Sequence, residues 1–85
     1  MPGYDYQLSS SAVRALFSST SRQRRHITEE VEHLATSPFQ PADLEESSPE
    51  GRTYSVAVCG DLIITYWLDH GAKQLNVLLL EFVTS

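Results

Sequence analysis

Two periods of apolar residues follow each other at the start of the chain. Between Tyr4 and Leu8 every second side chain is apolar or aromatic, and this period of two predicts a short, half-buried strand. Ser9 or Ser10 then suits a helix N-cap, because a serine hydroxyl accepts a hydrogen bond from a free backbone N–H. We therefore expect a short amphipathic helix next, with an apolar stripe of Ala12, Val13, Leu16 and Phe17.

A second, longer helix is predicted over residues 22–35. Ile27, Val31 and Leu34 recur at spacings of four and three, which places them on one helix face. The polar run 18–21 precedes this segment and offers an N-cap. We expect the helix to end before Pro38, because the residue before a proline avoids the α region.

The next pattern begins after a segment with little periodicity. Residues 39–51 are rich in acids, hold two of the four prolines and have Phe39 and Leu44 as their apolar anchors, so they are predicted to be irregular. Residues 53–59 alternate between apolar and polar positions as a strand does. Gly60-Asp61 follows and suits the two-residue turn of a β-hairpin of type II′.

The last two strands are predicted at 62–68 and 74–83, joined by a turn over 69–73. The first of them is apolar on both faces, as in a central, covered strand. Strands joined by short turns are usually antiparallel neighbours. We therefore predict one α+β domain over residues 1–85, in which two N-terminal helices pack on an antiparallel sheet of about four strands. The place of the first strand in that sheet does not follow from the pattern.

Charge and cysteine content narrow the function classes. The formal net charge of the 85 residues is −5, the opposite of the balance that favours unaided nucleic-acid binding. A single cysteine, Cys59, excludes an intrachain disulfide and fits a reducing compartment. No apolar run approaches the ~20 residues of a membrane helix, and no basic stretch followed by an apolar run opens the chain. We expect a cytoplasmic protein that does not associate with membranes.

Three segments of the sequence resemble the RelE/ParE superfamily of type II toxin–antitoxin toxins. The entry Tyr6–Ala12 is similar to the family's opening strand and helix, and His33–Phe39 is similar to the end of its second helix. Arg52–Tyr66 resembles its arginine-led hairpin with a Gly-Asp turn. The resemblance covers nearly the whole chain in element order and implies the same α+β fold.

The resemblance implies two activities, and the residues separate them. RelE-type members cleave mRNA on the ribosome, whereas ParE-type members inhibit DNA gyrase by binding it. After the hairpin turn the RelE type often has an aromatic residue and a catalytic arginine, where this chain has Leu62 and Ile63. Glu81 stands where the family tends to become cationic, and a basic, tyrosine-bearing tail is missing after it. No catalytic residue is therefore assigned, and a binding role is easier to defend.

Five basic residues are the candidates for contact with a partner or with nucleic acid: Arg22, Arg24, Arg25, Arg52 and Lys73. The alternative for the three arginines of the second helix is a solvated face that also carries glutamates. Arg52 occupies the start of the family's hairpin, although an arginine there also protects a strand edge.

The remaining conspicuous residues favour structural roles. The three histidines lack metal-ligand spacing, so neither a metal nor another cofactor is expected. Cys59 is expected to act as a small apolar residue, although a Cys–His nucleophilic pair stays open. Tyr66 and Trp67 point to opposite faces of one strand; at least one should be in the core, and Trp67 is a candidate to lie beneath a partner.

Three functions remain open at this stage. The first is a toxin that binds a protein target such as gyrase and is neutralised by an antitoxin. The second is an mRNA endonuclease, which would require Arg14, Arg52 and Lys73 or other cations to converge beside a general base. The third is a degenerate member that binds only an antitoxin-like partner or a second copy of itself.

Overall fold

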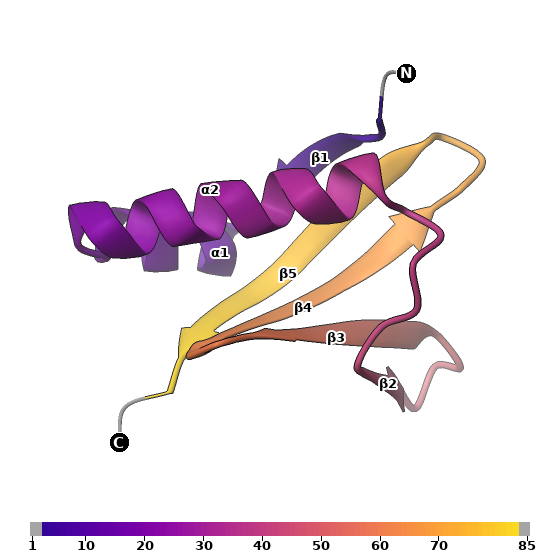
Figure 1. The fold of residues 1–85 in the computed structure, drawn as a ribbon. Helices are drawn as coiled ribbons and strands as arrows, with labels where there is room; N and C mark the ends of the chain where they lie inside the picture. Colours follow the sequence, from indigo (N-terminus) through magenta and orange to yellow (C-terminus); the bar gives the residue numbers. More distant parts are fainter. Residues whose placement is uncertain (1–2, 84–85) are drawn as a thin grey trace.

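The computed structural model describes residues 3–83, which form two helices and one five-stranded sheet (Figure 1). In chain order the elements are β1 (Asp5–Leu8), α1 (Ser10–Phe17), α2 (Ser21–Thr36), β2 (Leu44–Ser47), β3 (Thr53–Cys59), β4 (Leu62–Asp69) and β5 (Gln74–Phe82). The α+β class predicted from the sequence is confirmed. Neither helix in the described part of the chain is long and apolar enough to cross a membrane.

Side-chain caps begin both helices. The Ser9 hydroxyl accepts a hydrogen bond from the Ala12 N–H at 3.1 Å and donates one to the Leu78 carbonyl at 2.6 Å, so the cap also ties α1 to β5. Thr20 and Gln23 form a reciprocal capping box at the start of α2. Helix α2 ends at Thr36, just before Ser37-Pro38, as predicted.

The sheet has the strand order β1-β5-β4-β3-β2. The antiparallel neighbours β3, β4 and β5 were predicted and are confirmed. Strand β1 instead pairs with β5 in parallel, so the sheet is mixed and not purely antiparallel. It also has five strands where about four were expected, because β2 forms inside the segment predicted to be irregular.

Strand β2 is held at its edge by β3. Leu44 lies opposite Val56, and the Asp43 carboxylate just before the strand accepts a hydrogen bond from the Val58 N–H at 2.7 Å. The Asp43 N–H donates to the Val56 carbonyl at 3.1 Å. These contacts define a short pairing that the local sequence pattern does not reveal.

The β3–β4 turn has the geometry that its glycine allows. Cys59 pairs with Leu62, which leaves Gly60 and Asp61 as the two turn residues. Gly60 has a φ of 66°, the left-handed region that favours glycine. A positive φ at the first central residue fits the predicted type II′ turn.

One face of the sheet packs under both helices and forms the core (Figure 1). The fully buried large side chains are Ile27, Leu62, Ile64, Leu75, Val31 and Val77. Tyr66 points into this core and is 2% exposed. Strand β4 is central, as predicted, but helices cover only one of its two faces, so the expectation of cover on both sides is wrong.

Candidate functional site

The face of the sheet opposite the helices, here called the open face, is largely apolar. Successive residues of a strand point to opposite sides, so the register places Leu44, Val56, Thr65 and Leu79 in one row across four strands. Val56 is only 6% exposed, yet it does not belong to the core cluster under the helices.

A second row of the open face runs beside the first. It joins Val58, Ile63 and Glu81 on β3, β4 and β5. Leu44, Val58 and Leu79 are 58%, 49% and 37% exposed, respectively. Ile63 on β4 is partly exposed and lies between Val58 and Leu79, and a continuous run of exposed apolar side chains is typical of an interaction surface.

Trp67 and Arg52 occupy a third part of the open face. The Arg52 guanidinium lies 4.7 Å from the centre of the Trp67 ring, a cation–π contact. Such a contact is worth about 0.5–1 kcal/mol at an exposed position. The contact keeps the Arg52 cation beside the Trp67 ring.

Asn76 lies beside Trp67 on the neighbouring strand and carries an unsatisfied polar group. Among residues 3–83, the Asn76 side-chain Nδ2 is the buried side-chain nitrogen or oxygen that lacks a hydrogen-bond partner. A buried donor without a partner costs about 1–3 kcal/mol. Asn76, Trp67, Gln7 and Leu78 help to line a cavity of about 130 Å³.

Acidic side chains surround the apolar part of the open face. Glu46 on β2 and Glu81 on β5 are exposed and point to this side, and so do Asp5 and Asp69 by the alternation of their strands. Arg52 is the basic residue among them. The electrostatic character of this face is therefore negative.

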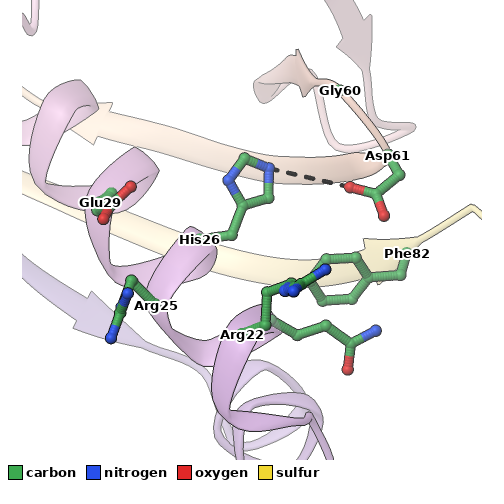
Figure 2. Close-up of a pocket in the computed structure, with 8 residues that line it drawn as sticks. Arg22, Arg25, His26, Glu29, Gly60, Asp61 and Phe82 are labelled. Atoms are coloured by element: carbon green, nitrogen blue, oxygen red, sulfur yellow. Dashed lines mark ion pairs between the residues drawn. The ribbon is translucent and has the colours of Figure 1, made fainter.

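A separate groove lies on the helix side, between α2 and the β3–β4 turn (Figure 2). It has a volume of about 470 Å³ and is lined in part by Arg22, Arg25, His26, Asp61 and Phe82. The His26 Nε2 atom lies 2.8 Å from the Cys59 carbonyl oxygen and 4.0 Å from the Asp61 carboxylate. The carbonyl and the carboxylate are both hydrogen-bond acceptors, so Nε2 carries the proton. The hydrogen bond from His26 to Cys59 connects α2 to the hairpin.

The structure separates the basic residues singled out from the sequence. Arg22 and Arg25 are brought together at the groove. Arg24 instead donates to the Ser19 carbonyl at 2.9 Å, at the start of the same helix. Arg52 lies on the open face, and Lys73 lies in the β4–β5 turn with a φ of 54°.

The three cations required for the nuclease interpretation do not share a site. Arg14 belongs to α1, in the helix layer, whereas Arg52 lies across the sheet on the open face. Lys73 is exposed in its turn. Within residues 3–83 these three cations therefore do not converge on one site.

Cys59 does not have the environment of a nucleophile. Burial, a hydrogen bond with Glu30 and the negative charges of Glu30 and Asp43 raise the pKa of its thiol to about 12. His26 contacts the carbonyl of Cys59 and not its sulfur. His33 lines the same small cavity as Cys59 but has no hydrogen bond to its sulfur, so within residues 3–83 the Cys–His pair left open by the sequence is not formed. Between residues 3 and 83, no group of three His, Cys, Asp or Glu side chains is arranged to hold a metal ion.

The arrangement of two helices on one face of this mixed sheet is a fold found in toxin–antitoxin complexes. The structure matches a chain of the RelBE2 toxin–antitoxin complex from Mycobacterium tuberculosis with a TM-score of 0.77 and 15% identity, over 95% of this chain and 99% of that one. It matches a chain of the archaeal RelE–RelB complex from Pyrococcus horikoshii OT3 with a TM-score of 0.74 and 20% identity, over 94% of each chain.

These matches confirm, at the level of fold, the resemblance drawn from the hairpin and the element order. No family model matches the sequence, and no curated protein matches it. The fold is therefore that of the chains matched in these RelE–RelB complexes.

The open face was only partly visible in the sequence. The signal is the apolar character of residues 62–68 on both sides, which predicts a strand covered on both faces. The hairpin offers a second signal. Counting back from the Cys59–Leu62 pair places Arg52 diagonally opposite Trp67, within reach of a long side chain. Asn76 does not show itself in this way, because its burial depends on the two strands that flank β5, namely β1 and β4.

Proposed function

We propose that this chain is the toxin component of a type II toxin–antitoxin pair, which acts by binding a cellular target and is neutralised by an antitoxin protein. The fold shared with chains of two toxin–antitoxin complexes supports the assignment to such a pair. The apolar open face supports a partner protein, because side chains such as Val58 and Leu79 gain from being covered.

The distribution of charge favours binding over RNA cleavage, and this observation carries the proposal. Attack of a 2′-hydroxyl on the adjacent phosphate needs a proton acceptor, a proton donor and positive charge on the developing phosphorane. The open face offers Arg52, already stacked on Trp67, with Glu46 and Glu81 on the same side of the sheet. Negative charge at that position would destabilise the transition state. A protein target of the gyrase type, as in the ParE resemblance, fits this surface better.

The test is induced expression of the chain in bacteria, alone and together with the product of a neighbouring gene. We expect growth arrest that the second protein relieves, intact mRNA during the arrest, and loss of gyrase supercoiling activity in vitro. A matched control is Ile63→Asp, which alters the open face and leaves the buried Ile64 in place.

Each alternative has its own signature in this experiment. Fragmented mRNA would establish the endonuclease instead. Unimpeded growth with a folded chain that still binds the neighbouring protein would establish the degenerate member. Unimpeded growth with no complex would reject the assignment to a toxin–antitoxin pair.

A further inference from the structure

We propose that the open face receives an amphipathic helix whose apolar stripe is flanked by lysine or arginine, so that the partner brings the positive charge and this chain the negative charge. The inference deepens the proposed function, on which it rests in taking the antitoxin as the source of the helix. It concerns the chemistry of the partner segment, which the fold does not define.

The row of apolar side chains forms the centre of the proposed contact with the helix. Leu44, Val56, Thr65 and Leu79 follow one another across β2, β3, β4 and β5. On β3, β4 and β5 the row offers side chains and not free backbone groups, because each of these strands is paired on both sides; β2 is the edge strand. A second layer on such a face is a helix or another sheet, and a single helix is the smaller segment that can cover it.

Two glutamates determine the charge on either side of that row. Glu46 is opposite Tyr54 on one side of the row, and Glu81 is opposite Ile63 on the other. Both are exposed, and neither has an ion pair in the described part of the chain. A helix that buries its apolar stripe on the row therefore brings both of its flanks to acidic side chains, where cations are complementary.

Other occupants fit these charges less well. A second copy of the chain would bring Glu46 and Glu81 of both molecules to one interface, where like charges repel. RNA would bring phosphates to an acidic face of a chain with a net charge of −5, with Arg52 as the cation beside them.

Trp67 allows a direct test, since it is the single tryptophan of the chain and lies on the open face. Two synthetic helical peptides without tryptophan share one leucine stripe and differ only in flanks of lysine or glutamate. We expect the lysine peptide to change the Trp67 fluorescence and to bind about tenfold more tightly than the glutamate peptide at low salt. The preference should shrink as salt is added.

Charge-reversed variants distinguish the effect of charge on the open face from the effect of the net charge of the whole chain. Glu46→Lys with Glu81→Lys should invert the preference between the two peptides. Glu29→Lys with Glu32→Lys makes the same change in net charge on α2, in the other layer, and should keep the original order. Circular dichroism verifies that both double variants are folded.

Several results would overturn the proposal. These are equal affinity for the two peptides, no binding of either, or a preference that the open-face variant retains. Single-stranded RNA that binds with a change in Trp67 fluorescence would assign the face to nucleic acid. Self-association that shields Trp67 would assign it to a second copy.

The outcome is distinct from that of the growth experiment. An antitoxin that neutralises the chain and binds the Glu46→Lys/Glu81→Lys variant undiminished would reject the charge assignment and leave the proposed function standing. A chain without toxicity that shows the expected peptide preference would reject the proposed function and leave the surface assignment standing.

Discussion

Ile63 and Ile64 are neighbours in β4 that point to opposite faces of the sheet, and replacing each with alanine tests which face is covered. Ile64 is 0% exposed and lies between Ala57 and Leu80 in the core under the helices. Ile63 lies on the open face and is partly exposed. Both substitutions remove the same three carbon atoms and change the strand propensity equally, so the difference between them measures burial.

The expected magnitudes follow from that burial. Truncation of a fully buried isoleucine to alanine costs about 2–5 kcal/mol, because the lost transfer energy is joined by a cavity. The 85 residues support a free energy of unfolding of about 4–13 kcal/mol. We expect Ile64→Ala to lose about 3 kcal/mol, and Ile63→Ala about 1 kcal/mol. At about 4–8 °C per kcal/mol, the Tm of the Ile64 variant should fall by about 12–24 °C.

The assay is urea unfolding followed by far-UV circular dichroism, with the m-value held common to both variants. Losses that agree within about 0.5 kcal/mol would refute the description of β4 as covered on one face. Repeating the measurement at a tenfold higher protein concentration distinguishes a face that is covered by self-association, because only then does the Ile63 loss depend on concentration.

Three further predictions concern single side chains. Because the folded chain raises the pKa of the Cys59 thiol from 9.0 to about 12, the unfolded chain releases this proton first, and stability should fall as pH rises between these values. The slope is below about 1.4 kcal/mol per pH unit, since the thiol is partly exposed, and urea unfolding should show a shallower slope in Cys59→Ala. Gly60→Ala should cost about 1–2 kcal/mol in thermal unfolding, because alanine resists a φ of 66°; an unchanged Tm would contradict the turn. Thr20→Ala should cost about 1 kcal/mol by removing the capping box, whereas Thr28→Ala, an exposed mid-helix control, should cost less.

Local pattern was sufficient to predict the elements whose residues determine their own structure. The stripe of α2, the Gly60-Asp61 turn and the alternation of β3 are each encoded within a few residues. Strand β2 was missed because four residues with two glutamates and one leucine carry no such pattern. Its pairing comes from β3 and from Asp43, which is 15 positions before its partner Val58.

Long-range pairings account for the other difference. The parallel place of β1 beside β5 joins Tyr6 to Leu75, and no property of either segment indicates this neighbour. For the same reason the sequence indicates which basic residues are candidates for partner contact, but not which of them lie close together. Whether Arg22 and Arg25 face one groove, while Arg52 lies on the other side of the sheet, depends on how the layers assemble.

The pairing of the first strand with the last has a consequence for the timing of folding during synthesis. Strand β5 lies between β1 and β4 and supplies Leu75, Val77 and Leu80 to the core beneath both helices (Figure 1). The segments made earlier therefore have only part of the surface on which their apolar stripes pack until β5 has been made. Contacts between such distant positions also close slowly. A nascent chain thus leaves part of the stripes of α1 and α2 uncovered until β5 has been added, and this last strand of the described residues completes the fold.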